Sequence, residues 1–233
     1  MAYLKGTERE KFVRKTFAEI APRYVFMNHL MSGGVDILLR REMARLACPQ
    51  PGESVLDLGS GTGDLAKEIL RKFPSTNITA ADFSLEMMTA TENWLSIKRT
   101  AADALHLPFA DASFDLVTSG YLVRNVINLA TTLAEQFRVL RPGGRVLILD
   151  MTKPRSNLFT PLINFYLKRI IPVLGGFFNR NRTAYTYLIQ STQNFVTAES
   201  LACAMEKAGF RDIHFRIRMF GTMAIHTGFK PAG

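Results

Sequence analysis

The sequence lacks any uninterrupted apolar run of about 18 or more residues, so nothing in it is typical of a membrane-spanning helix. Its first six residues have no apolar region of the kind that marks a secretory signal. Cysteine is scarce, because only Cys48 and Cys203 are present, and this excludes a disulfide framework. We expect two reduced, mostly buried thiols in a cytoplasmic protein. The four histidines show no metal-ligand spacing, so no metal site is expected.

The charge is one-sided but not concentrated. The chain has 29 Lys and Arg against 20 Asp and Glu, which gives a net charge of +9. Such a balance permits binding to nucleic acid, to an anionic membrane surface or to an acidic ligand, and it selects none of them. The basic residues are scattered along the chain, so a generally basic surface is the simplest interpretation. With 233 residues and 47% hydrophobic residues, the chain is long enough for one α/β domain with a full core.

The most informative stretch covers residues 55–65, where a short apolar run leads through three alternating glycines into a helical pattern. This order predicts a buried strand, a tight turn and a helix N-terminus that can approach a ligand closely. The spacing is G-x-G-x-G, and Asp64 stands where a dinucleotide fingerprint needs its third glycine. A carboxylate such as Asp57 or Asp64 disfavours a pyrophosphate and attracts the ammonium group of S-adenosylmethionine. For this motif alone, a turn that merely joins strand to helix remains an alternative.

Strand and helix patterns alternate along the chain, which predicts an α/β fold with a mainly parallel sheet. Ligands of such sheets bind at the carboxyl ends of the strands, where several polar residues fall. One of them is Asp82, which ends the second strand and is placed to bind ribose hydroxyls. The convergence of these strand ends favours a nucleoside-type cofactor. The residues concerned are Asp57, Gly59–Gly63, Asp82, Asp103 and Ser119.

We expect one domain overall, with residues 1–48 as an N-terminal helical cover of the active site and 49–233 as the catalytic domain. Its helical insertion covers about 156–195 and contains a strongly apolar stretch at 158–178, which is interrupted by Lys168, Arg169 and two prolines. That stretch either lines a channel, docks at a membrane surface or packs as a buried helix pair. The expected strands are 54–58, 77–81, 98–102, 114–119, 145–150, 211–218 and 222–230. The expected helices are 8–21, 35–47, 64–73, one capped by Ser84, 126–140, 181–195 and 198–208.

The order of motifs resembles class I S-adenosylmethionine-dependent methyltransferases, and more narrowly the menaquinone and ubiquinone biosynthesis C-methyltransferases. The resemblance covers nearly the whole chain from about residue 12. It implies a Rossmann-like fold with a seven-stranded, mainly parallel sheet, helices on both faces and an antiparallel C-terminal strand. The motifs that carry it are Met27-Asn28-x-Leu30-Met31-Ser32-x-Gly34, Gly61-Thr62-Gly63-Asp64-Leu65-Ala66, Leu107-Pro108-Phe109-x-Asp111-x-x-Phe114-Asp115, Arg124-Asn125-Val126, Arg138-Val139-Leu140-Arg141-Pro142-Gly143-Gly144, Lys153-Pro154, Tyr185-x-Tyr187-Leu188-x-x-Ser191 and Gly221-x-x-x-x-His226-x-Gly228-x-Lys230.

The resemblance implies methyl transfer from S-adenosylmethionine to a ring carbon of a prenylated quinol. It places Arg124 beside a developing phenolate and Asn125 beside a ring oxygen. The further catalytic candidates are Tyr24, His29, Tyr121 and, as a base, Asp150. The cofactor-binding candidates are Asp57, Gly59, Gly61, Thr62, Asp82, Phe83, Asp103, Ala104, Ser119 and Gly120.

Several positions depart from the family pattern, and most of them belong to the expected acceptor pocket. Val25 and His29 stand where the family has acids, and Ile37 and Leu39 replace a basic residue and a Trp. The family's F-G-L before Arg124 is Tyr121-Leu122-Val123, its cofactor-contacting Ser aligns with Gly120, and its glutamate aligns with Asp150. The departures put the identity of the acceptor in doubt, not the type of reaction.

Three other functions compete with this interpretation. The first is methylation of another apolar small molecule, the second is methylation of RNA or DNA, and the third is a non-enzymatic binding protein that keeps the fold. The second lacks support, because residues 119–122 do not read as the Asn/Asp-Pro-Pro-aromatic pattern and no Pro-Cys nucleophile follows, so no nucleic-acid partner is expected. The expected partners are a prenylated quinol, an anionic membrane surface and a second copy in a homodimer. The expected location is the cytoplasm, at the inner face of the membrane.

Overall fold

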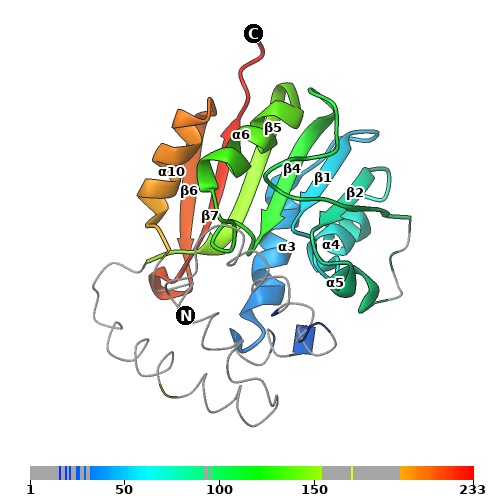
Figure 1. The fold of residues 1–233 in the computed structure, drawn as a ribbon. Coiled ribbons are helices and arrows are strands. Elements are labelled where there is room, and N and C mark those ends of the chain that lie inside the picture. Colours follow the sequence, from blue (N-terminus) through cyan, green and yellow to red (C-terminus); the bar gives the residue numbers. More distant parts are fainter. Residues whose placement is uncertain are drawn as a thin grey trace.

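The computed structural model describes residues 32–91, 96–153 and 195–233, together with Thr16, Glu19, Ala21, Val25, Phe26, His29, Trp94 and Arg169. Within these residues the chain forms one sheet with helices on both faces (Figure 1). The expected helices 8–21 and 181–195 lie almost entirely outside the described residues, as do the apolar stretch 158–178, apart from Arg169, and the expected insertion, apart from Arg169 and Phe195.

The sheet has seven strands in the order β3-β2-β1-β4-β5-β7-β6. β1 to β5 are parallel, and β7 runs antiparallel between β5 and β6. This confirms the expected Rossmann-like class I methyltransferase topology. The strands are β1 (Ser54–Leu58), β2 (Asn77–Asp82), β3 (Lys98–Ala101), β4 (Phe114–Gly120), β5 (Leu140–Met151), β6 (Arg211–Arg218) and β7 (Met223–Phe229).

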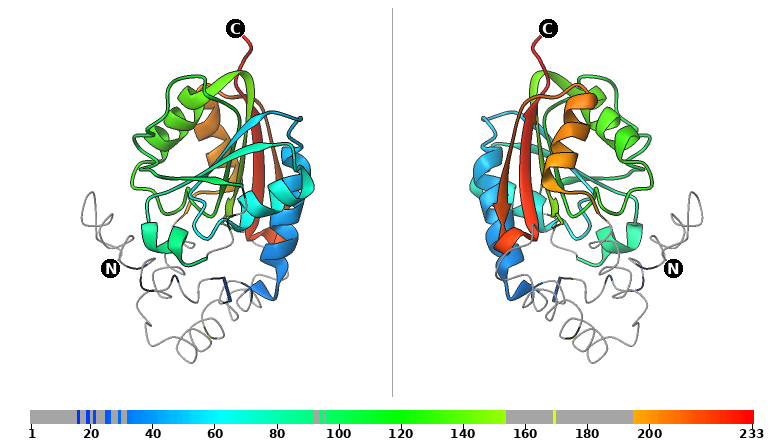
Figure 2. Two further views of the ribbon diagram at one scale, coloured as in Figure 1. Left: turned by 90° about the vertical axis from the view of Figure 1, so that its right-hand side faces the viewer. Right: turned by 90° about the vertical axis from the view of Figure 1, so that its left-hand side faces the viewer.

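Five helices flank the sheet in the described part of the chain. Helices α3 and α4 cover one face, and α6 and α10 cover the other (Figure 2). Side-chain caps fix three of the helix starts: Ser84, Asn128 and Thr197 each accept a hydrogen bond from a backbone N–H in the first turn. The helices are α3 (Val35–Ala47), α4 (Asp64–Lys72), α5 (Leu85–Thr89), α6 (Leu129–Val139) and α10 (Ala198–Lys207).

Two expected boundaries were wrong. The expected helix 126–140 begins only at Leu129, because the Asn128 side chain accepts a hydrogen bond from the Thr131 N–H and caps the helix there. The expected strand 145–150 begins earlier, at Leu140, which is fully buried and pairs with Phe114 of β4. A shift in register between these strands accommodates the glycine-rich turn that follows Leu140.

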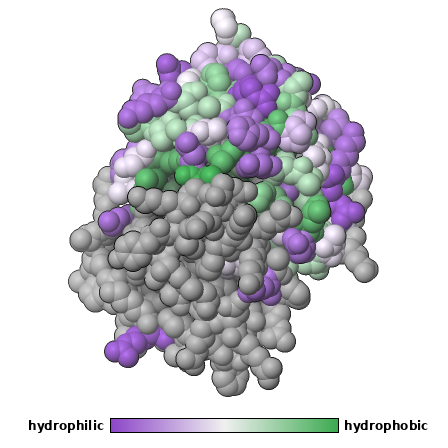
Figure 3. All heavy atoms as spheres, viewed as in Figure 1, coloured by the Kyte–Doolittle hydropathy of each residue, from purple (hydrophilic) through white to green (hydrophobic). Residues whose placement is uncertain are grey.

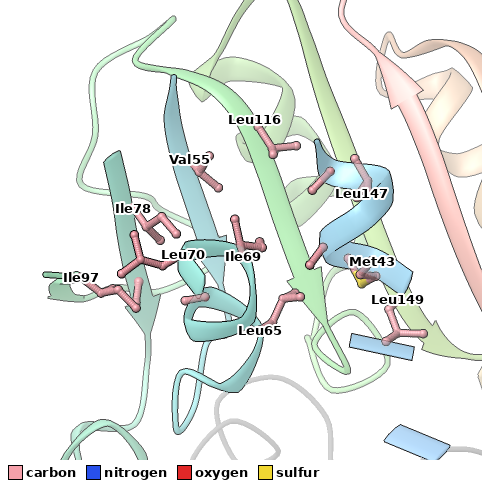
Figure 4. Packing of buried hydrophobic residues seen from close by; sticks show 14 of the residues in the cluster. Met43, Val55, Leu65, Ile69, Leu70, Ile78, Ile97, Leu116, Leu147 and Leu149 are labelled. Atoms are coloured by element: carbon pink, nitrogen blue, oxygen red, sulfur yellow. The ribbon is translucent and has the colours of Figure 1, made fainter. Parts of the chain in front are cut away.

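Successive residues of each strand point to opposite faces of the sheet and pack into two separate hydrophobic cores, as the two-residue period of a strand requires. Val55 of β1 and Leu116 of β4 lie on the face covered by α3 and α4 and belong to the same core as Ile69 (Figure 4). The next residues along the same strands, Leu56 and Val117, belong to the core on the opposite face, beneath α6 and α10. Burial on both faces explains why these strands read as apolar runs and why the sheet is rigid enough to position a site at its edge.

Helix α3 is part of the main core. Its residues Met43, Ala44 and Ala47 have no exposed surface and belong to the cluster that contains Val55 and Ile69. The expected cover over residues 1–48 therefore includes a helix that shares the hydrophobic core of residues 49–233. The division at residue 48 stays a prediction for the residues that precede Ser32.

The surface of the described part is mixed, with polar and apolar side chains interspersed over the face in Figure 3. Among the described residues, no helix has the length and apolar character needed to cross a membrane. Cys48 and Cys203 are both free and both exposed, so the expectation of mostly buried thiols was wrong. Cys48 follows the last residue of α3 and Cys203 lies on the outer side of α10, where the packing of each helix leaves the side chain in solvent.

Candidate active site

A hollow of about 1160 Å³, solvent included, opens at the carboxyl ends of β1, β2 and β4. β1 lies between β2 and β4, so the hollow sits where the strand order reverses, the usual ligand site of such sheets. Nine of the ten expected cofactor residues line it, and Ser119 is the exception. The nine are Asp57, Gly59, Gly61, Thr62, Asp82, Phe83, Asp103, Ala104 and Gly120.

The glycine turn between β1 and α4 forms the floor of the hollow. Gly59, Gly61 and Gly63 have φ angles of +68°, +57° and +78°, a region that only glycine enters without strain. The turn is also tightly packed, because a Cβ on Gly59 would lie 2.8 Å from Leu122 Cδ1. Glycine is therefore required here both for the backbone conformation and for the space above the turn.

Asp82 ties this turn to the end of β2. One carboxylate oxygen accepts a hydrogen bond from the Gly61 N–H at 2.7 Å, and the other accepts one from the Ser84 N–H at 2.8 Å. Burial raises the pKa of Asp82, although these N–H donors act in the opposite direction. The Phe83 N–H also donates to this carboxylate, so three of its four or so lone-pair sites are taken and one remains for a ribose hydroxyl.

Asp57 is a buried acid at the end of β1, with only 1% of its surface exposed. One oxygen accepts a hydrogen bond from Thr118 Oγ1 at 2.9 Å, and Oδ2 has no hydrogen-bond partner among the described residues. Burial raises the pKa of Asp57 to about 6, and the bond from Thr118 lowers it only in part. A cationic ligand in the hollow would favour the ionised carboxylate.

The residues after β3 and β4 complete the cofactor end of the hollow. Asp103 accepts a hydrogen bond from the Leu105 N–H, which fixes the loop on which Ala104 lines the hollow. Ser119 is fully buried in β4 and does not reach the wall, whereas Gly120 does. The expectation that Ser119 contacts the cofactor directly is therefore not supported by its position, and Gly120 presents backbone only.

Tyr121 is the expected catalytic residue with the most unusual backbone. Its φ of 62° lies in the left-handed region, which costs a residue with a side chain about 1–2 kcal/mol. Its N–H donates to the Leu149 carbonyl at 2.7 Å, and its hydroxyl lies 3.8 Å from Met223 Sδ. These contacts hold the ring at the wall of the hollow, between β4 and the end of β5.

Arg124 and Asp150 come together as a buried ion pair. Arg124 Nη1 lies 2.6 Å from Asp150 Oδ1, and the Arg124 N–H donates to Oδ2 at 3.1 Å. The Met151 N–H donates to the same carboxylate, so both oxygens are engaged. Neither residue is among the described residues that line the hollow, and Arg124 lies 5.3 Å from the centre of the Tyr121 ring. A carboxylate held in this way is a poor general base, so that role for Asp150 is not supported.

The remaining catalytic candidates are spread out. Asn125 lines the hollow and donates through Nδ2 to the Tyr121 carbonyl at 3.0 Å. His29 is not among the described lining residues, and its Nδ1 lies 2.7 Å from Asp36 Oδ2. Tyr24 lies outside the described residues. The hollow thus brings Tyr121 and Asn125 to its wall, while His29 is held by an acid on α3.

The sequence reasoning missed Arg40, which lines the hollow from α3. The signal was present, because Asp36 and Arg40 fall on the same side of the helix as Leu39, Met43 and Ala47. Two charged residues four positions apart on an otherwise apolar face are typical of a functional or paired site. Asp64, also on the wall, accepts a hydrogen bond from Thr62 Oγ1 at 3.0 Å.

The residues present fit S-adenosylmethionine. Its sulfonium and ammonium are cations, its ribose is a diol, and the described lining supplies carboxylates for each, at Asp57, Asp64 and Asp82. Asp57 Oδ2 is a buried acceptor without a partner among the described residues, which is the condition expected of a group that a ligand completes. The glycine turn brings Gly59, Ser60, Gly61 and Thr62 to the wall of the hollow.

The comparisons with known proteins agree along nearly the whole chain. Residues 5–230 match the ubiE/COQ5 methyltransferase family. The chain is 42% identical over 238 residues to a ubiquinone/menaquinone biosynthesis C-methyltransferase of Desulfotalea psychrophila, with 98% of this chain and 97% of that protein covered. It is 38% identical over 220 residues to a demethylmenaquinone methyltransferase of Thermus thermophilus, with 92% and 100% covered.

Solved structures share the fold at much lower identity. A Haemonchus contortus phosphoethanolamine N-methyltransferase aligns with a TM-score of 0.69 at 15% identity, covering 94% of this chain and 60% of that one. The [4+2]-cyclase SpnF aligns with a TM-score of 0.68 at 16% identity, covering 95% and 96%. The second shows that the fold also occurs in a cyclase, so the family match carries the assignment. The chain belongs to the ubiE/COQ5 methyltransferase family and is an S-adenosylmethionine-dependent methyltransferase.

Proposed function

We propose that the protein methylates a ring carbon of a prenylated quinol, either demethylmenaquinol or a precursor of ubiquinol, in quinone biosynthesis. One observation carries the proposal: proteins named for this reaction match nearly the full chain at 38% to 42% identity. The match extends over both the cofactor half and the acceptor half of the sequence, which a shared fold alone does not require.

The walls of the hollow fit an aromatic acceptor. Beyond the acidic cofactor end, the described lining is mostly apolar, and it is rigid because it is built on the ends of β4 and β5. Such a surface binds a ring by its faces and leaves only a few polar groups to orient it. The apolar and aromatic lining residues at this end are Tyr121, Leu122, Val126, Ile127 and Leu149.

When bound, S-adenosylmethionine supplies an electrophilic methyl group on a sulfonium. The protein has to orient the acceptor ring and increase its electron density, which it achieves by stabilising a deprotonated ring oxygen. Asn125 lines the hollow and can hold such an oxygen. Arg124 lies behind Tyr121 with its guanidinium 5.3 Å from the ring centre, so its positive charge acts close to the acceptor. Asp150 keeps that guanidinium in place.

The experiment that tests the proposal is a transfer assay with S-adenosylmethionine labelled in the methyl group. The purified protein is given a prenylated naphthoquinol and a prenylated benzoquinol, each lacking one ring methyl and each reduced chemically beforehand. We expect label in one or both quinols and none in the oxidised quinones, because the oxidised ring is electron-poor. If the cofactor binds and no quinol is labelled, the proposal fails, and label in another apolar lipid identifies the acceptor.

We also propose that the protein visits an anionic leaflet at the cytoplasmic face of the membrane. A quinol with an isoprenoid tail resides in the bilayer, and a net charge of +9 favours attraction to anionic lipids. Sedimentation with vesicles tests this: binding is expected to anionic vesicles at low salt, to weaken with added salt and to be weaker for neutral vesicles. Equal recovery in the supernatant with both vesicle types contradicts it.

A homodimer is a further proposal, carried over from the sequence. Sedimentation equilibrium on the purified protein over a range of concentrations measures the mass directly, and a mass of one chain at every concentration contradicts it.

A further inference from the structure

The charges on the wall of the hollow are unequal. Four carboxylates line it, those of Asp57, Asp64, Asp82 and Asp103. Within the described lining, Arg40 is the basic residue that faces them. S-adenosylmethionine carries two cations, a diol and one carboxylate. The four acids can bind the sulfonium, the ammonium and the ribose diol. The amino-acid carboxylate of the cofactor would be repelled by these acids, so it requires a positively charged partner.

Arg40 is held in a fixed position. Its Nη1 lies 2.5 Å from Asp36 Oδ2, one helical turn earlier on α3, and its Nη2 lies 3.7 Å from Asp64 Oδ2 at the start of α4. The guanidinium lies 5.7 Å from the centre of the Tyr121 ring. The residue is 9% exposed. A guanidinium has five N–H donors in a planar fork, so one side can be anchored while another binds a carboxylate.

Asp36 is held in place to bind Arg40. It is 2% exposed, and its second oxygen accepts a hydrogen bond from Ser32 Oγ at 2.6 Å. Burial raises the pKa of Asp36, but the Ser32 hydrogen bond and the charge of Arg40 outweigh it and lower the pKa below its usual value. The acid is therefore ionised and fixes the Arg40 side chain without occupying the wall of the hollow.

The place of Arg40 along the hollow matches the methionine end of the cofactor. Asp103 follows β3 and Asp82 ends β2, while Tyr121, beside Arg40, follows β4. In the sheet order these strands lie on opposite sides of β1. A ligand whose ribose binds at Asp82 and whose base lies near Asp103 extends towards β4, where Arg40 meets its other end.

We propose that Arg40 binds the amino-acid carboxylate of S-adenosylmethionine and that Asp36 positions it. The proposal depends on the identity of the methyl donor and not on that of the acceptor ring, so it can fail while the proposed quinol methylation stands. The competing explanation is a structural one, in which Arg40 only joins α3 to the start of α4 through Asp36 and Asp64.

Isothermal titration of the full chain with two ligands separates these explanations. The ligands are S-adenosylmethionine and its decarboxylated form, which keeps the sulfonium and the ammonium and lacks only the carboxylate. For Arg40→Gln we expect the Kd for S-adenosylmethionine to rise about 10- to 100-fold, as for loss of a charge-assisted hydrogen-bonding pair. The Kd for the decarboxylated ligand is expected to stay within about twofold or to fall, because a cation is removed near a cationic ligand.

Arg41→Gln is the matched control. Arg41 is the next residue on α3, is exposed and lies 3.8 Å from Glu68, away from the hollow. We expect both affinities to remain unchanged in this variant. Arg40→Lys keeps a positive charge beside Asp36 and replaces Arg40→Gln as the test if that variant does not fold. It is expected to lower the affinity for S-adenosylmethionine more than the affinity for the decarboxylated ligand.

Three results overturn the proposal. The first is a wild-type protein that binds the two ligands equally well, since no group then receives the carboxylate. The second is a folded Arg40 variant with unchanged affinity for S-adenosylmethionine. The third is an equal loss for both ligands, which assigns Arg40 the structural role.

Discussion

Arg124 and Asp150 are joined inside the protein by a 2.6 Å contact between Nη1 and Oδ1, with side chains only 7% and 1% exposed. Removing one partner of such a pair leaves the other charge buried and uncompensated. Asp150→Asn is therefore expected to lower the free energy of unfolding by about 3–5 kcal/mol, measured by urea denaturation. The double variant Arg124→Met with Asp150→Leu is the control and is expected to recover part of the loss. A neutral effect of Asp150→Asn would contradict the pairing.

The same arginine is expected to affect turnover separately from cofactor binding. Arg124→Ala removes the positive charge behind Tyr121, and we expect kcat to fall about 10-fold or more, less than for a donor in direct contact with the developing charge, because Arg124 is not among the described residues that line the hollow. The Kd for S-adenosylmethionine, measured by titration, is expected to change little, because Arg124 is not among the described residues that line the hollow. A parallel loss of cofactor affinity would contradict this assignment.

Asp57 is expected to make the free protein less stable as the pH rises. Its pKa in the folded protein is about 6, against an ordinary value of 3.8, so the folded state holds the proton more tightly. The resulting destabilisation is absent below pH 4 and complete above pH 6, and it amounts to about 3 kcal/mol. Asp57→Asn removes this dependence.

The measurement is the difference in unfolding free energy between Asp57→Asn and the wild type, determined by urea denaturation at several pH values from 4 to 7.5. Other acids whose pKa is lowered, such as Glu53 and Glu135, contribute equally to both proteins and cancel. The difference is expected to grow in favour of the variant as the pH rises. A difference in unfolding free energy that does not vary with pH would contradict the conclusion that burial favours the neutral form of Asp57.

Gly63 and Gly143 have similar backbone conformations but different surroundings, so substitutions at the two positions separate backbone strain from packing in the glycine turn. Gly63 and Gly143 have φ angles of +78° and +77°, but a Cβ on Gly63 would lie 2.4 Å from Trp94 Cζ3, whereas nothing lies within 4 Å of one on Gly143. Gly143→Ala is expected to cost about 1–2 kcal/mol of backbone strain. Gly63→Ala is expected to cost about 1–3 kcal/mol more in thermal or urea unfolding. Equal losses would show that the Trp94 ring moves freely.

Asp82 is expected to control cofactor affinity. Asp82→Ala removes an acceptor for the ribose and also the bond that holds the Gly61 N–H, so we expect the Kd for S-adenosylmethionine to rise at least about 10-fold. Asp82→Asn keeps an oxygen that can accept from Gly61 and is expected to lose less. Unchanged affinity in Asp82→Ala excludes the ribose role.

The positions of most strands could be predicted from the sequence, because the local pattern of apolar residues determines them. Residues 54–58 and 211–218 have the predicted bounds, and Ser84 caps its helix as its position indicated. The early start of β5 could not be predicted. Residues 141–144 have the composition of a turn, and only the pairing of Leu140 with Phe114, a tertiary contact, extends the strand across them. The antiparallel C-terminal strand was expected from the family resemblance and not from periodicity, and the order of the strands was not predicted.

The cofactor end of the site was predictable because one rule, ligands at the carboxyl ends of parallel strands, places Asp57, Asp82 and Asp103 together. No such rule predicts which residues meet at the acceptor end of the site. Arg124 and Asp150 are 26 positions apart in the sequence, and their pairing depends on how β5 packs beside the loop after β4. Tyr121 was expected as a contact, but its left-handed backbone follows from the surrounding contacts and not from its own residue type.

The antiparallel position of β7 has a consequence for how the protein is assembled. β6 is synthesised before β7, yet it has no neighbour in the sheet until β7 pairs with both β6 and β5. We therefore expect β6 and β7 to form a local hairpin that docks on β5 as a unit, covering an edge that would otherwise invite aggregation. Docking also brings Met223 against the Tyr121 hydroxyl. We therefore expect a chain that has not completed its sheet to lack the contact that holds Tyr121 at the wall of the hollow.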